Sequence, residues 1–289
     1  MGIATKLSAS FRDSLQIRKE SAAVLQVSVR HGRNMAVISD FRREAIMTTF
    51  HTVARRRTYA DAFLVLTAFW FLLLSIFHAW PMIDIRISEM FFSGPLCLDP
   101  SSLNACGSFP LGEDRLITTL RWILYTLPYA AAAMVLIALV VAAFSPRLRH
   151  QMPVHRLWLS LAGLGISTGL IANLFLKEYS SRPRPIQTDL FGGKLPFMAA
   201  GSFHGACERN CSFVSGEASG AGWLICLPFL LPPRYRLWVA PPVILASVAT
   251  AALRVAVGAH YASDATLGML VSITVFVGLL AFEEAVLER

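Results

Sequence analysis

The chain has 289 residues, of which 55% are hydrophobic and 15% are charged, and its mean hydropathy is +0.56. Soluble domains carry roughly 25% charged residues, so this composition excludes an ordinary soluble fold and indicates an integral membrane protein. The net charge of +8 does not require nucleic acid as a partner. Basic residues gathered in alternate loops of a membrane protein set its orientation and explain the same charge.

Residues 1–57 are polar and basic, with eleven Lys or Arg against four Asp or Glu. They end in Arg55, Arg56 and Arg57 beside the first apolar run, and such a cluster marks the cytoplasmic side. The short apolar core and cleavage site of a secretory signal peptide do not follow. We interpret residues 1–57 as a cytoplasmic extension, either a surface helix or a disordered tail, and residues 58–289 as a membrane domain. A start at Met35 or Met47 is an alternative.

Six apolar runs follow, most of them near the length that crosses a bilayer of about 30 Å. They lie at about residues 59–80, 117–144, 157–176, 214–231, 237–253 and 264–282. The short loops after the second and fourth runs are basic, whereas residues 82–115 hold five acidic residues against two basic ones. This asymmetry predicts an all-α, polytopic bundle of six transmembrane helices with both termini in the cytoplasm.

Polar side chains between the last two runs suggest a reactive site on the outer face. His260 and Asp264 are four residues apart and share one face if the run is helical. A carboxylate there orients an imidazole and leaves its other ring nitrogen free to attack. Arg254 supplies a planar fork that suits phosphate oxygens. The alternative is a His–Asp pair with an Arg reaching from a helix end to the lipid interface.

A second polar cluster, at residues 177–185, follows the third run on the same predicted face. Lys177, Arg182 and Arg184 can neutralise phosphate oxygens there, and two prolines stiffen the backbone between them. The alternative is a basic loop that touches lipid headgroups.

The third cluster opens the fourth run. Ser215 and Gly216 stand where a helix begins, so their hydroxyl and N–H groups form either an anion site or an ordinary helix cap. Glu217 follows them. We interpret it either as a proton donor, if burial raises its pKa, or as a first-turn acid that suits the helix dipole.

In order, the clusters read K-x6-R-P, S-G and R-x5-H-x3-D. Over roughly residues 60–285 the chain thereby resembles the PAP2 (type 2 phosphatidic acid phosphatase) superfamily, whose motifs are K-x6-R-P, P-S-G-H and S-R-x5-H-x3-D. The resemblance implies a PAP2-type bundle and a set of phosphate-binding residues, which are Lys177, Arg184, Ser215, Gly216 and Arg254.

The resemblance also implies a mechanism without a metal or cofactor. His260 attacks phosphorus to form a phosphohistidine, Asp264 orients it, and water then releases phosphate. Three positions depart from the family motifs. Val214 replaces a proline, Leu253 replaces a serine, and Glu217 replaces the histidine that protonates the leaving oxygen. Glu217 is therefore the expected general acid, with His204 of the preceding loop as the alternative.

An active site at a membrane edge suits a phosphate carried by a lipid. The variant S-F-V-S-G-E-A-S looks like the rhizobial-type lipid A phosphatases, so we expect hydrolysis of lipid A, at its 4′-phosphate, on the periplasmic face of a bacterial inner membrane. Undecaprenyl pyrophosphate, phosphatidylglycerophosphate and phosphatidic acid are alternative substrates. A lipid phosphotransferase and a non-catalytic phospholipid-binding or transport protein are alternative functions.

Two cysteine pairs fall in the predicted outer loops. Cys97 and Cys106, and likewise Cys207 and Cys211, can form disulfides if the compartment is oxidising. His204 with Cys207 and Cys211 is an alternative set of zinc ligands.

Overall fold

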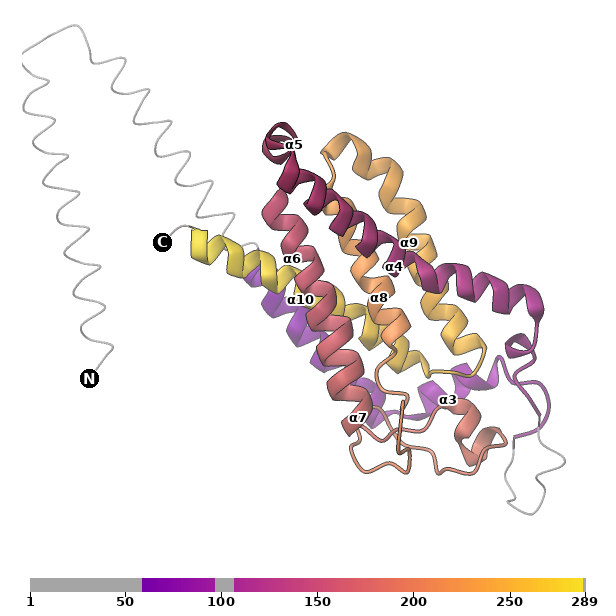
Figure 1. Cartoon of the computed structure of the whole chain (residues 1–289). Helices are drawn as coiled ribbons and strands as arrows, with labels where there is room; N and C mark the ends of the chain where they lie inside the picture. Colours follow the sequence, from indigo (N-terminus) through magenta and orange to yellow (C-terminus); the bar gives the residue numbers. More distant parts are fainter. Residues whose placement is uncertain (1–58, 97–106, 288–289) are drawn as a thin grey trace, which may run out of the picture. The chain divides into compact units, whose positions relative to one another are not determined.

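The structure is a computed structural model that describes residues 59–96 and 107–287 (Figure 1). The predicted N-terminal extension and the Cys97–Cys106 pair lie outside the described residues. Regular structure within the described ranges is helical, which confirms the predicted all-α class. In this described part of the chain, five helices are long and apolar enough to cross a membrane, so the chain is a multi-pass membrane protein.

The five membrane-spanning helices begin and end close to five of the six predicted runs. They are Tyr59–Ala79, α4 (Arg115–Phe144), the continuous helix Val154–Tyr179, α9 (Pro233–Ala256) and α10 (Ala262–Leu287). Several extend past the apolar run because caps and polar residues continue the helix. Asp114, for example, caps α4 by accepting a hydrogen bond from the N–H of Ile117 at 2.9 Å.

The helix Val154–Tyr179 is built from three segments. α6 (Val154–Leu164) continues into a π-helical segment, η3 (Gly165–Leu176), and then into the short α7 (Lys177–Tyr179). π-Helical turns are rare and often lie at functional sites. Here the π-helical segment runs along the cavity described below and ends just before Lys177.

The fourth predicted run forms a shorter helix than expected. α8 (Gly216–Cys226) has eleven residues and is followed by the 3₁₀ turn η6 (Leu227–Leu230). Nine of its eleven residues are buried, and it contacts α4, α6, η3, α9 and α10. α8 is thus the central helix of the bundle, and a count of six spans stays a prediction.

Small residues allow α8 to lie this deep. A Cβ added to Gly222 would stand 2.3 Å from the carbonyl oxygen of Met269 on α10, so the two backbones touch there. Hydroxyl groups add polar contacts from α8 to both η3 and α10. Ser219 bonds to Thr168 at 2.9 Å and to Ser272 at 2.8 Å. This packing holds the N-terminus of α8 at a defined place in the bundle.

The remaining short elements lie at the end of the bundle where α8 begins (Figure 1). They are α3 (Met82–Glu89), η2 (Pro110–Gly112), η4 (Pro185–Gln187) and η5 (Asp189–Phe191). The short helix α5 (Pro146–Gln151) lies at the opposite end, between α4 and α6. The long loop between η5 and α8 crosses the first of these ends and brings its residues to the start of α10.

Candidate active site

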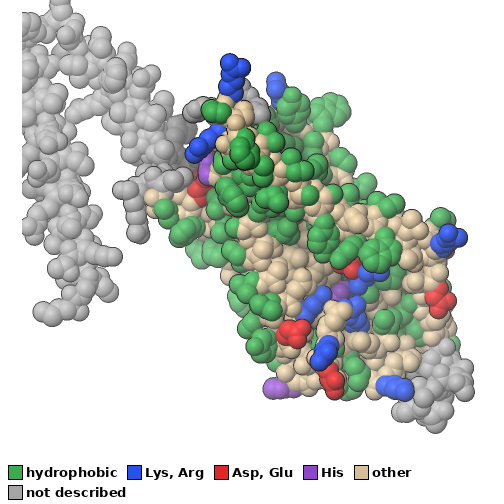
Figure 2. All heavy atoms as spheres, viewed as in Figure 1, with side chains coloured by type: hydrophobic (Ala, Val, Ile, Leu, Met, Phe, Trp, Pro, Cys, Tyr) green, Lys and Arg blue, Asp and Glu red, His purple; other side chains and the backbone are tan. Residues whose placement is uncertain are grey.

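A cavity of about 620 Å³ lies among α4, α6, η3 and α8, near the end of the bundle that carries the long loops. Figure 2 shows Lys and Arg side chains gathered around a histidine on one face, within a largely hydrophobic surface. Six of the nine predicted site residues line the cavity: Lys177, Arg184, Gly216, Glu217, Arg254 and His260. They come from all three of the clusters that are separated in the sequence.

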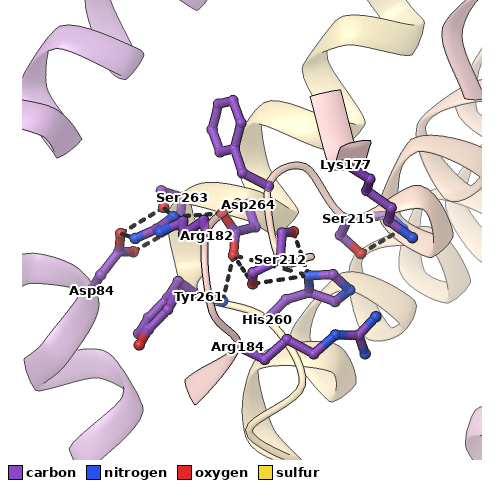
Figure 3. A network of polar contacts seen from close by, with 12 residues as sticks. Asp84, Lys177, Arg182, Arg184, Ser212, Ser215, His260, Tyr261, Ser263 and Asp264 are labelled. Atoms are coloured by element: carbon purple, nitrogen blue, oxygen red, sulfur yellow. Dashed lines mark hydrogen bonds and ion pairs between the residues drawn. The ribbon is translucent and has the colours of Figure 1, made fainter. Parts of the chain in front are cut away.

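His260 is held by a backbone carbonyl. Its Nδ1 lies 2.8 Å from the carbonyl oxygen of Ser212, and only 1% of the residue is exposed. Because a carbonyl only accepts, Nδ1 carries the proton and Nε2 keeps its lone pair. Figure 3 shows the other ring nitrogen turned away from Ser212 toward the side of Arg184 and Lys177. That nitrogen is the one available for attack.

The charge state of His260 suits a nucleophile. Burial lowers its pKa well below the usual 6.5, and the positive charges of Arg254, Arg184 and Lys177 lower it further. The ring is therefore neutral at physiological pH, as an attacking imidazole must be.

Asp264 contacts His260 less directly than the sequence predicts. Its Oδ2 is 3.9 Å from Nδ1 of His260 and instead accepts the hydroxyl of Ser212 at 2.5 Å and the N–H of Tyr261 at 3.0 Å. Ser212 thus stands between the carboxylate and the ring (Figure 3). Sequence reasoning did not find Ser212, because it lies in a loop 48 residues before His260.

Arg182 does not take part in the cavity, contrary to the prediction that all three basic groups of its cluster meet phosphate. It is fully buried and donates to Asp84 at 2.8 Å and to Asp264 at 2.5 Å. Its guanidinium lies 4.3 Å from the ring centroid of Tyr261. Two carboxylates draw the side chain into the protein, so Arg182 anchors the start of α10 instead of binding a ligand.

Lys177 and Arg184 share a neutral partner. Arg184 donates to the side-chain oxygen of Asn210 at 2.9 Å and to its carbonyl at 3.0 Å, and Nζ of Lys177 is 3.5 Å from the same side-chain oxygen. Asn210 has a left-handed backbone with φ of 49°. Because Asn210 is uncharged, it does not neutralise Lys177 and Arg184. Their positive charges therefore remain available to attract an anionic ligand.

Ser215 and Gly216 form the predicted start of α8. Ser215 is the N-cap, and its hydroxyl accepts the N–H of Ala218 at 3.3 Å. Gly216 lines the cavity, and an added Cβ would stand 2.4 Å from the amide oxygen of Asn173. The helix N-terminus therefore meets the cavity at a residue that cannot carry a side chain without a shift of Asn173.

Glu217 also lines the cavity but is paired with two arginines. Its Oε1 accepts from Nη2 of Arg121 at 2.8 Å and lies 3.4 Å from Nη1 of Arg254. Sequence reasoning missed Arg121, which lies in the second apolar run. Its position could have identified it, because an ionisable residue within a membrane-spanning run is a candidate functional residue.

His204 is exposed and does not line the cavity, so the structure does not bring this alternative acid to the site. Cys207 and Cys211 are joined in a disulfide, which makes the zinc-ligand interpretation wrong because no thiolate remains for a metal. Among residues 59–96 and 107–287, no group of three His, Cys, Asp or Glu side chains is placed to hold a metal ion.

Comparisons with known proteins agree with this arrangement. Residues 156–286 match the PAP2 superfamily. A lipid A 4′-phosphatase of Rhizobium etli is 42% identical over 240 residues, covering 81% of this chain and 91% of that protein. A lipid A 4′-phosphatase of Rhizobium leguminosarum is 43% identical over 223 residues, covering 75% and 94%.

Among solved structures, a PAP2-type phosphatidylglycerolphosphate phosphatase from Bacillus subtilis has the same fold. The TM-score is 0.50 at 19% identity, and the match covers 78% of this chain and 96% of that one. The family resemblance carried by the three motifs is thereby confirmed. The chain belongs to the PAP2 superfamily and is a membrane phosphatase, a hydrolase of phosphoric monoesters.

Proposed function

We propose that the protein is a lipid phosphatase that removes the 4′-phosphate of lipid A at the periplasmic face of the bacterial inner membrane. The observation that carries this proposal is the cavity in which a neutral, buried His260 faces Lys177, Arg184 and Arg254. The 42% and 43% identity with two lipid A 4′-phosphatases supports lipid A as the substrate.

The chemistry has two steps. Nε2 of His260 gives its lone pair to phosphorus, and the bond to the lipid oxygen breaks with its electron pair on that oxygen. The lipid leaves as an alcohol after taking a proton. Water then attacks the phosphohistidine, phosphate departs, and the ring returns to its neutral form. Positioning and charge stabilisation by the three cations supply most of the catalysis in such transfers.

The lining of the cavity supports a substrate that is partly lipid. Beyond the cations, the wall is formed by residues without charge on α6 and η3, including Leu161, Leu164, Gly165 and Gly169. A Cβ added to either glycine would meet nothing within 4 Å, so the space beside η3 is open. An anionic end beside an apolar wall matches a phosphate on an acylated headgroup.

The distribution of charge supports the proposed orientation. Arg147 and Arg149 on α5, and Arg234 and Arg236 at the start of α9, lie at the end of the bundle opposite α7 (Figure 1). Short basic loops stay in the cytoplasm. The cavity end, near Lys177, would then face the periplasm.

The test is phosphate release from lipid A by the purified full chain in detergent, with mass spectrometry to locate the phosphate that is lost. We expect loss of the 4′-phosphate as free inorganic phosphate. His260→Ala should lower the rate by roughly four orders of magnitude or more, as removal of a nucleophile does, while the melting temperature stays close to the wild-type value. Full activity in His260→Ala would refute the nucleophile, and phosphate recovered on a second lipid would indicate a transferase.

A further inference from the structure

Two arginines share one carboxylate at the wall of the cavity. Arg121 reaches Glu217 from α4 at 2.8 Å, and Arg254 reaches the same oxygen from α9 at 3.4 Å. All three side chains line the cavity together with His260. Arg121 lies outside the three motifs, and Glu217 replaces the motif histidine. The family motifs therefore do not account for the contact between these two side chains.

The group has more hydrogen-bond donors than the protein satisfies. Nε of Arg121 and Nε of Arg254 are buried and have no partner among the described residues, and Oε2 of Glu217 is likewise buried without one. Each guanidinium therefore meets Glu217 at a single nitrogen. Unpaired buried donors are costly, and an anion with several oxygens is the ligand that would satisfy them.

The three side chains differ in how far they are exposed, and the most exposed one is the best placed to contact a ligand. Arg121 is 28% exposed at the cavity, Glu217 is 14% exposed and Arg254 is 5% exposed. Glu217 is thus set back between the two arginines and contacts both, while Arg121 is the most accessible. A carboxylate that contacts two guanidinium groups at one oxygen fixes their positions relative to each other.

We propose that Arg121 is a further phosphate-binding residue and that Glu217 positions Arg121 and Arg254, instead of acting as the proton donor. This proposal rests on the proposed function, because it assumes that the cavity binds the substrate phosphate. With Arg121 included, four cations and one carboxylate line the cavity, and their net positive charge favours a phosphate monoester dianion over a singly charged diester.

Proton transfer then involves water. When the bond between phosphorus and the lipid oxygen breaks, a cavity water molecule gives its proton to that oxygen. The resulting hydroxide attacks the phosphohistidine, which yields hydrogen phosphate and neutral His260. Protons and charge balance without a proton from the protein.

The role of Arg121 is tested by inhibition with inorganic phosphate, using full-length enzyme and a lipid phosphate monoester as substrate. Arg121→Met should raise both the phosphate Ki and the KM by roughly tenfold to a hundredfold, the effect of losing a charged hydrogen bond. Arg121→Lys keeps the charge but loses the fork, so it should show a smaller rise. Arg115→Met, at an exposed arginine of the same helix, is the matched control and should leave both constants unchanged. Wild-type Ki and KM in Arg121→Met would overturn the assignment.

The role of Glu217 is tested with two leaving groups. Glu217→Gln should slow hydrolysis of the lipid phosphate and of 4-nitrophenyl phosphate by the same factor, and the pH profile of kcat should keep its shape. A proton donor behaves differently: its loss slows the lipid ester far more than the nitrophenyl ester and removes the alkaline fall of kcat. That result, with either readout, would overturn the positioning role. If the wild-type enzyme releases no phosphate from any lipid, the proposed function itself fails; if it does and only the variants disagree, this inference alone fails.

Discussion

At His260, Nδ1 donates to the Ser212 carbonyl, and Asp264 acts on the ring through Ser212. The tautomer is set by a backbone group whose place depends on the loop before α8. The carboxylate has a second task, because it also binds the buried Arg182. Local sequence spacing predicted that His260 and Asp264 lie close together, and the two side chains are 3.9 Å apart. It did not predict the serine between them.

The lowered pKa of His260 leads to a prediction on pH dependence. Protonation would occupy the Nε2 lone pair, so kcat/KM falls on the acid side as pH drops through this lowered pKa. Arg184→Gln removes one of the positive charges that lower the pKa of His260. The acid limb should therefore move to higher pH in this variant. The comparison with wild type on the same substrate cancels ionisation of the substrate itself. An acid limb that stays in place or moves to lower pH would contradict the electrostatic account.

Arg182 leads to a prediction on stability. Arg182→Met leaves Asp84 and Asp264 buried without their cation, so we expect a loss of about 3–5 kcal/mol in unfolding free energy. Chemical unfolding in detergent, followed by circular dichroism, measures the change. Arg86→Met, at an exposed position on α3, should change stability by less than about 0.5 kcal/mol. Equal stabilities for the two variants would show that the buried ion pairs are not needed.

At the scale of elements, α8 determines where the site lies. Its glycines and alanines let it pack among five neighbouring helical segments, and its N-terminus brings Gly216 and Glu217 to the cavity. An apolar run alone predicted a full-length span here. The structure instead forms an eleven-residue helix followed by a 3₁₀ turn, because Pro228 and the Pro232–Pro233 pair interrupt helical hydrogen bonding.

The packing of α8 predicts opposite effects at two glycines. Gly222→Ala forces a methyl group against the backbone of α10 and should lower the unfolding free energy by about 1–3 kcal/mol. Gly165→Ala on η3 meets open space, so stability should hold or rise by up to about 1 kcal/mol. Thermal unfolding of both variants in one detergent makes the comparison. A destabilised Gly165→Ala beside an unaffected Gly222→Ala would contradict this packing.

In the molecule as a whole, residues from separate helices and loops meet at one end of a helical bundle, and short basic loops lie at the other. Lys177 ends one helix, Arg184 lies in a loop, Arg254 lies near the end of α9 and His260 precedes α10. Each of the helical segments reaches the same end because successive spans reverse direction. Residues that are far apart in the sequence therefore lie close together in the structure.

Topology leads to a prediction on labelling. In a chain with Cys97 and Cys106 replaced by serine, His204→Cys should react with a membrane-impermeant maleimide in cells whose outer membrane is permeabilised. Tyr235→Cys, at an exposed position in the first turn of α9, should react only after the inner membrane is broken. Both side chains are exposed, so a difference in labelling would not be due to burial of one of them in the protein. The reverse pattern would place the cavity in the cytoplasm.

Hydropathy and motif spacing are local properties of the chain, and from them the sequence predicts the membrane class, the approximate ends of five spans and six of the residues that line the cavity. The three-dimensional fold was needed to show that Arg182 is buried away from the cavity, that Ser212 stands between Asp264 and His260, and that Arg121 contacts Glu217. These contacts connect residues 48 to 98 positions apart. Helix packing determines which of these distant residues come into contact, and a sequence pattern within one segment does not contain that information.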